Sequence, residues 1–84
     1  MTNNTVKVAV IGCGRVSGHH CRSIVQTEGA ELIAVCDLLI EKAHAYHKEF
    51  GAKAYDNYHR MLLENPQINT VAIVTPSGMH YEHA

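Results

Sequence analysis

Two glycines carry the chemistry that this sequence offers most clearly. Gly12 and Gly14 follow a short apolar run, Val6 to Ile11, and precede a stretch with helical spacing. A strand that passes through such a turn into a helix presents backbone N–H groups to an anion such as a pyrophosphate. Gly12 permits the tight turn, and Gly14 lets the backbone approach the phosphates without a Cβ in the way. The spacing therefore predicts a phosphate-binding turn.

A third small residue and an acid extend this pattern. Ser17, beside Gly18, stands where the third glycine of G-x-G-x-x-G would lie, and serine is small enough for close packing. A second apolar run, Glu31 to Cys36, ends in Asp37, about twenty residues beyond the glycines. The Asp37 carboxylate can accept hydrogen bonds from ribose hydroxyls, cap the following helix, or do both. Strand, turn, helix, strand and acid in this order predict a dinucleotide-binding site.

The size and composition of the chain fit one small domain. It has 84 residues, of which 46% are hydrophobic and 18% charged, and its formal net charge is −1. No basic excess indicates a nucleic-acid partner, and no apolar run approaches the roughly 18 residues that span a bilayer. The N-terminal stretch lacks the apolar core of a signal peptide, so we expect a cytoplasmic protein. Three cysteines without a C-x-x-C pair argue against disulfides, and Cys21 and Cys36 are expected to face the core.

Apolar periodicity predicts strands that alternate with helices. Strands are expected at about residues 6–11, 31–36, 52–55 and 70–74, and helices at about 14–28 and 39–50. Asp56 is expected to cap a brief third helix that ends by Asn65, and Met79 to Ala84 to open another helix. The alternation implies right-handed crossovers. We therefore predict an α/β fold, a truncated Rossmann-type parallel sheet of about four strands with flanking helices.

The first two helices each have a predicted buried stripe. In the first, the residues that face the sheet are expected to be Ser17, Cys21, Ile24 and Val25. In the second, they are expected to be Leu39, Ala43, Tyr46 and Phe50.

The histidines and tyrosines raise the question of a metal site and of stacking on a ligand, and neither is expected. His44-x-x-His47 and His80-x-x-His83 each place two imidazoles on one helical face. Zinc needs three or four convergent ligands, so no metal site is expected. The remaining tyrosines are expected to pack rather than to stack on a ligand: Tyr55, Tyr58 and Tyr81.

Four segments resemble the N-terminal nucleotide-binding half of the glucose–fructose oxidoreductase / inositol 2-dehydrogenase (Gfo/Idh/MocA) family. They are VAVIGCGRVSGHH, LIAVCD, AYDNYHRML and TVAIVTPSGMH, and they span nearly the whole chain. The last is the most specific, because the family follows its fourth strand with Thr-Pro-x-x-x-His. The resemblance implies enzymes that oxidise or reduce a carbinol carbon of sugars, sugar nucleotides or polyols with NAD or NADP. It also implies a second domain that holds the substrate, so residues 1–84 are expected to be the N-terminal part of a dinucleotide-binding domain.

The resemblance also implies which residues contact the cofactor. From the pyrophosphate through the adenosine ribose to the nicotinamide half, they are Gly12, Gly14, Arg15 and Val16, then Asp37, then Thr75, Pro76, Ser77 and His80. Ser77 stands where the family often has asparagine. For Arg15 and His80 an alternative stays open, in which Arg15 is a solvent-exposed arginine and His80 a residue at the end of a helix, without contact to the cofactor. The family's catalytic lysine, in a Glu-Lys-Pro motif, and its acid–base histidine fall beyond Ala84. No catalytic residue is therefore assigned.

Asp37 favours NAD over NADP. The 2′-phosphate of NADP would meet this carboxylate, and two like charges about 4 Å apart repel by roughly 4 kcal/mol at an effective dielectric of about 20. Leu38, Leu39 and Ile40 follow Asp37 directly, so no arginine stands next to it to receive a phosphate. Lys42 is the nearest cation in the sequence and is expected to point away from the pocket.

A second function remains open, and a third is disfavoured by the residues before the glycines. A non-catalytic regulatory module that binds a dinucleotide fits the same residues, since a fold does not fix function. A methyltransferase usually has an acid just before the glycines, where this chain has Val10 and Ile11. In the dehydrogenase interpretation, the partners are a small sugar or polyol substrate and, through the second domain, further copies of the chain.

Overall fold

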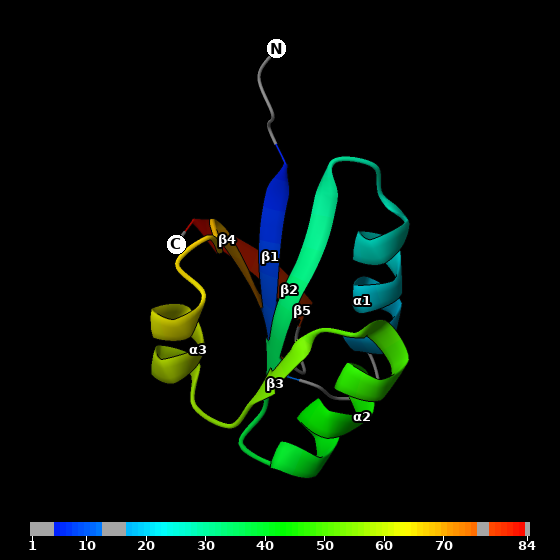
Figure 1. Ribbon diagram of the computed structural model, residues 1–84. Coiled ribbons are helices and arrows are strands. Elements are labelled where there is room, and N and C mark those ends of the chain that lie inside the picture. The colour runs from blue at the N-terminus through cyan, green and yellow to red at the C-terminus, as the bar shows by residue number, and fades with distance from the viewer. Residues whose placement is uncertain (1–4, 13–16, 76–77, 84) are drawn as a thin grey trace.

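The computed structural model describes residues 5–12, 17–75 and 78–83, which form a five-stranded sheet flanked by three helices (Figure 1). The strands are β1 (Val6–Ile11), β2 (Ala30–Cys36), β3 (Lys53–Tyr55), β4 (Thr70–Thr75) and β5 (Gly78–His83). The helices are α1 (Ser17–Gln26), α2 (Ile40–Phe50) and α3 (Tyr58–Glu64). The sheet order is β3-β2-β1-β4-β5, with β1 to β4 parallel and β5 antiparallel to β4. The predicted Rossmann-type parallel sheet is confirmed.

The order of the strands creates a switch point at the centre of the sheet. The chain moves outward from β1 through β2 to β3, and then adds β4 on the other side of β1. In the register of the sheet, Ile11 lies beside both Cys36 and Ile73. The carboxyl ends of β1, β2 and β4 therefore meet at one edge, which is where ligands bind in open parallel sheets.

Helices cover both faces of the sheet. In Figure 1, α1 and α2 lie on one side of the strands and α3 lies on the other. The core on the α1 and α2 side consists of Val8, Val10, Cys21, Ile24, Val35, Ala43, Ala52 and Ala72. The core on the α3 side consists of Ala9, Ala34, Cys36, Met61, Ile68 and Val71. Successive strand side chains point to opposite faces, so burial on both sides explains the continuous apolar stretches at residues 8–11 of β1 and 71–74 of β4.

The predicted buried stripes of the helices are only partly right. Cys21 and Ile24 are buried as expected, but Val25 is 46% exposed. Val25 follows Ile24 in the helix and is rotated by about 100° around its axis, which turns it away from the sheet. In α2, Ala43 is fully buried, whereas Leu39 precedes the helix and is 55% exposed.

The ends of α2 and α3 are set by local hydrogen bonds. Gly51 ends α2 with a φ of +78°, and its N–H donates to the carbonyl of His47 at 2.8 Å. Asn57, not Asp56, caps α3, because its side-chain oxygen accepts a hydrogen bond from the N–H of Arg60 at 3.1 Å. Asn57 is extended, with a φ of −138° and a ψ of 117°, as an N-cap requires. The predicted cap at Asp56 is therefore wrong by one position.

The segment after β4 is a strand, not the predicted start of a helix. Residues Gly78–His83 pair antiparallel with β4, from Thr75 opposite Gly78 to Thr70 opposite His83. A helix of six residues closes only about two intrahelical hydrogen bonds. Pairing along β4 instead satisfies the backbone groups at the edge of the sheet. The prediction of a helix from Met79 is wrong because the segment finds an available strand edge.

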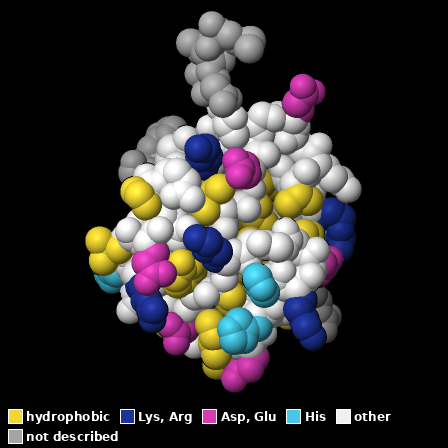
Figure 2. Space-filling view, viewed as in Figure 1, with side chains coloured by type: hydrophobic (Ala, Val, Ile, Leu, Met, Phe, Trp, Pro, Cys, Tyr) yellow, Lys and Arg dark blue, Asp and Glu magenta, His cyan; other side chains and the backbone are white. Residues whose placement is uncertain are grey.

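Charges are mixed on the face shown in Figure 2, and no helix in the described part of the chain resembles a membrane span. On the face shown in Figure 2, basic and acidic side chains alternate rather than gather in a block of one sign. Within the described residues, every helix is too short and too polar to cross a bilayer.

Candidate functional site

Gly12 lies between two strands at the carboxyl edge of the sheet. Its φ is +95°, and its N–H donates to the carbonyl of Cys36 at 2.8 Å. A Cβ on Gly12 would lie 2.7 Å from the carbonyl oxygen of Val74 in β4. Both the backbone conformation and this close approach therefore require glycine at the start of the turn.

Asp37 follows β2 at the same edge. Its N–H donates to the carbonyl of Tyr55 at 3.1 Å, and its Oδ1 accepts a hydrogen bond from the N–H of Leu39 at 2.8 Å. This bond forms an Asx turn ahead of α2, whose own N-cap, Leu39, has no side-chain cap. A carboxylate accepts up to about four hydrogen bonds. The turn is therefore compatible with a second role in binding a ribose.

A cleft of about 420 Å³ joins Gly12 and Asp37 at this edge. It also includes residues that the sequence analysis did not select: Ile11, Cys36, Leu38, Asp56, Asn57, Tyr58 and His59. Several of them come directly after β3, so the rule that ligands bind at the carboxyl ends of parallel strands was the signal that could have found them.

Exposed apolar side chains border the cleft. Leu38 is 92% exposed, and Tyr58 is 45% exposed, with its ring 4.1 Å from that of His59. The sequence predicts that Tyr58 packs rather than stacks on a ligand; as the first residue of α3 it contacts the ring of His59 but keeps nearly half of its side chain exposed. Tyr55, by contrast, packs as expected: its hydroxyl donates to Glu64 at 3.0 Å and accepts from Asn65 at 3.0 Å.

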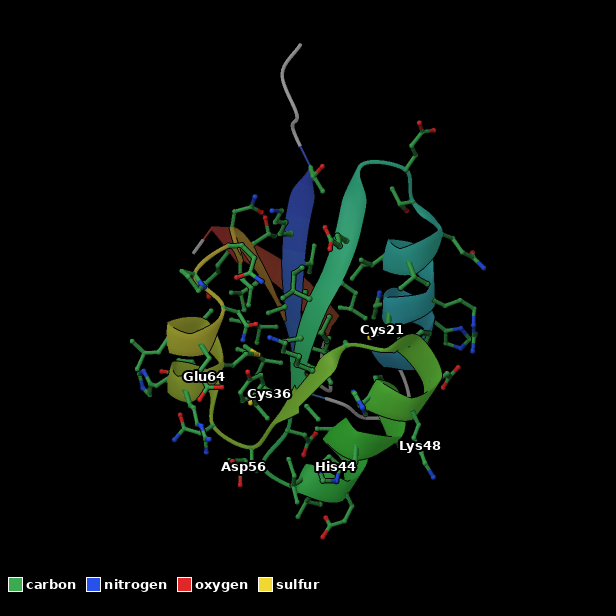
Figure 3. All side chains as sticks on the ribbon, viewed as in Figure 1. Cys21, Cys36, His44, Lys48, Asp56 and Glu64 are labelled. Atoms are coloured by element: carbon green, nitrogen blue, oxygen red, sulfur yellow. The ribbon has the colours of Figure 1, made fainter. Side chains whose placement is uncertain are left out.

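The floor of the cleft contains a neutral thiol near two carboxylates. Cys36 is only 5% exposed, and burial raises its pKa, with Asp37 and Asp56 adding to the effect. Figure 3 shows Cys36 at the end of β2 and Asp56 in the loop that follows β3. Among the described residues that line the cleft, none is a lysine or arginine. The described residues therefore give the cleft two carboxylates and no side-chain cation to balance them.

The remaining predicted site residues are less fully described. Five of them lie outside the described residues: Gly14, Arg15, Val16, Pro76 and Ser77. Thr75 ends β4, which pairs with β1, so its backbone reaches the same edge as Gly12. His80 lies in β5, and its backbone pairs with Ile73. The structure does not describe the side chains of Thr75 and His80.

Histidines and acids also lie outside the cleft, along the edge of β3. Within the described ranges, no group of three or more His, Cys, Asp or Glu side chains is arranged to hold a metal ion. His47 is instead held by the carbonyl of Ala52, 2.7 Å from its Nδ1. A second cavity, of about 490 Å³, runs along the outer edge of β3, between His44 of α2 and Glu64 of α3 (Figure 3). Of the described residues that line it, only Asp56 also lines the cleft, and neither Gly12 nor Asp37 is among them.

Comparison with known proteins identifies the class to which this fold and cleft correspond. Residues 6–84 match the Gfo/Idh/MocA family, described as an oxidoreductase family with an NAD-binding Rossmann fold. The chain is 35% identical to the D-glucoside 3-dehydrogenase of Escherichia coli (strain K12), over 99% of the chain and 24% of that protein. It is 36% identical to the scyllo-inositol 2-dehydrogenase (NAD(+)) of Bacillus subtilis (strain 168), over 89% of the chain and 22% of that protein.

A solved structure shares the architecture. The WlbA dehydrogenase from Bordetella pertussis, in complex with NADH and UDP-GlcNAcA, matches with a TM-score of 0.78 and 30% identity. The match covers 87% of this chain and 23% of that one. The chain therefore spans less than a quarter of the length of each of these relatives.

Proposed function

Since the chain belongs to the Gfo/Idh/MocA oxidoreductase family, we propose that its cleft binds NAD for an enzyme that oxidises or reduces a CH–OH carbon of a sugar, sugar nucleotide or polyol. The names of its relatives support this substrate class, since they include a glucoside dehydrogenase and an inositol dehydrogenase. WlbA, solved with NADH and UDP-GlcNAcA, supports a nicotinamide cofactor.

The observation that carries the proposal is the position of Gly12 and Asp37 on one cleft of about 420 Å³. At Gly12 a Cβ would lie 2.7 Å from the carbonyl oxygen of Val74, so the tight turn requires glycine here, as the first glycine of a dinucleotide-binding turn does. Asp37, one strand away, is placed to accept hydrogen bonds from the adenosine ribose. The exposed side chains of Leu38 and Tyr58 line the same cleft and offer apolar contact to an adenine ring.

The other predicted contacts extend along the same edge. Gly14, Arg15 and Val16 would complete the pyrophosphate turn after Gly12. The nicotinamide half would lie near the end of β4, against Thr75, Pro76, Ser77 and His80. The nicotinamide ring, when bound, supplies the site that accepts or donates hydride, while the residues of this chain bind and orient it.

NAD is the preferred cofactor in this proposal. Asp37 and a 2′-phosphate at about 4 Å would repel by roughly 4 kcal/mol at an effective dielectric of about 20. None of the cleft residues that the structure describes offers an arginine or lysine to a phosphate.

The catalytic residues and the substrate pocket would belong to a longer protein. The relatives are more than four times the length of the matched chain, which fits a cofactor domain followed by a substrate domain. The lysine of the Glu-Lys-Pro motif has no counterpart in these 84 residues. We therefore expect the chain alone to bind NAD without turning over a sugar. Any homo-oligomer is expected to form through the substrate domain. The expected location of the protein is the cytoplasm.

Calorimetric titration of the 84-residue chain tests the proposal. NAD+ should bind saturably and more tightly than NADP+, and Asp37→Ala should weaken NAD+ binding. Glu28→Ala is the matched control, because Glu28 is an exposed acid in the turn before β2, at the opposite edge of the sheet. Tighter binding of NADP+ than of NAD+ would contradict the cofactor assignment. Absence of binding by either dinucleotide would contradict the function.

A further inference from the structure

Asp56 lies beside Asp37 because of the register between β2 and β3. Cys36 and Tyr55 are register partners, so Asp37 and Asp56 are the next residues on neighbouring parallel strands. The hydrogen bond from the N–H of Asp37 to the carbonyl of Tyr55, at 3.1 Å, continues this pairing beyond the strands. Neighbouring strands are about 4.8 Å apart. Two acids therefore stand side by side where the sheet opens onto the cleft.

The cap of α3 does not use the side chain of Asp56. Asn57, rather than Asp56, accepts the hydrogen bond that begins this helix. Asp37 and Asp56 both line the cleft of about 420 Å³. Burial is the main cause of the raised pKa of Cys36, which also lines the cleft, and both carboxylates raise this pKa further. The two negative charges therefore act on the same small volume.

Asp56 also borders a cavity that contains basic side chains. It lines the cavity at the edge of β3 as well, and Lys53 and Arg60 lie in that cavity. Arg60 is held by Glu64, with 2.8 Å between its Nε and Oε2. Among the described residues that line the cleft, the charged ones are therefore Asp37 and Asp56.

We propose that Asp56 is a second specificity-determining residue, which together with Asp37 selects a ribose without a 2′-phosphate. This inference rests on the proposed function and extends it to a residue outside the glycine and aspartate pattern. A phosphate monoester carries about −1.5 to −2 charges at neutral pH. Each carboxylate therefore repels the phosphate, whereas a ribose hydroxyl donates a hydrogen bond to a carboxylate. Removal of the Asp56 charge lowers the repulsion of the phosphate.

The test is the ratio of the dissociation constants for NADP+ and NAD+. It is measured by calorimetry on the 84-residue chain, its Asp56→Asn variant and the control Glu28→Gln, which removes the same charge from an exposed site at the opposite edge of the sheet. Asp56→Asn should shift the ratio toward NADP+ by about tenfold, which corresponds to about 1.4 kcal/mol. The shift should shrink as salt is added, because the charges are partly exposed to solvent. Glu28→Gln should leave the ratio unchanged.

Three results would overturn the inference, and they are distinguishable. If the wild-type chain prefers NAD+ and Asp56→Asn keeps the same ratio, Asp56 does not select the cofactor, while the proposed function stands. If Asp56→Asn weakens both dinucleotides equally, Asp56 holds their common adenosine part and does not sense the phosphate. If the wild-type chain binds neither dinucleotide, the proposed function fails and the inference fails with it. Circular dichroism of each variant shows whether a loss of binding reflects loss of the fold.

Discussion

Replacement of Gly12 by alanine tests the geometry of the turn most sharply. The φ of +95° at Gly12 costs an alanine about 1–2 kcal/mol, because its Cβ approaches the following carbonyl. The same Cβ would lie 2.7 Å from the carbonyl oxygen of Val74. That atom belongs to a central strand and cannot rotate away, so overpacking adds about 1–3 kcal/mol. We expect Gly12→Ala to lower the free energy of unfolding by about 2–5 kcal/mol in total.

Gly29 provides a matched control. Its φ is +86°, but a Cβ there meets nothing within 4 Å. Gly29→Ala should therefore cost only the backbone term of about 1–2 kcal/mol. Urea denaturation followed by circular dichroism gives both values, and the difference between them isolates the contact with Val74. Equal losses in the two variants would refute the reasoning that close packing, and not only backbone conformation, requires glycine at position 12.

Three further predictions concern the core, a helix cap and a buried thiol. Met61→Ala removes a fully buried side chain and should lower the free energy of unfolding by about 2–5 kcal/mol. Leu63→Ala, at an 81% exposed position, should change it by less than about 0.5 kcal/mol. Equal losses in urea denaturation would contradict the assigned core. Asn57→Ala should cost about 1 kcal/mol in the same assay, and a larger loss in Asp56→Ala would contradict the assigned cap. Burial, with a smaller effect of Glu49, raises the pKa of Cys21 from 9.0 to about 11, so the folded thiol keeps a proton that the unfolded chain releases. Stability should therefore fall from pH 9 to about pH 11, and this fall should flatten in Cys21→Ala.

The features that the sequence predicted are those encoded by neighbouring residues. The apolar run of β1, the turn at Gly12 and the acid after β2 follow one another within a single crossover, so their order alone fixes the sheet edge at which they meet. The ends of α2 and α3 at Gly51 and Asn65 were predictable for the same reason, since each depends on residues within one turn of helix.

The features that the sequence did not predict depend on contacts between distant segments. Asp56 and Tyr58 join the cleft only because β3 pairs with β2, and the register that brings Asp56 beside Asp37 is not a local property. The cap of α3 was misplaced because Asp56 and Asn57 are both good N-caps, and the start of the helix decides between them. The segment from Gly78 became a strand because β4 offers it an edge, which its own spacing does not reveal.

Amide NMR spectra of the isotope-labelled chain, recorded during a titration with NAD+, test whether a dinucleotide binds at the carboxyl edge of the parallel strands, β1 to β4. The largest shifts are expected at Gly12, Asp37, Leu38 and Tyr58, whereas Glu28 and Gly29 at the other edge of the sheet should stay unchanged. Shifts concentrated instead on the cavity beside β3, at His44 and Lys53, would refute binding at this edge.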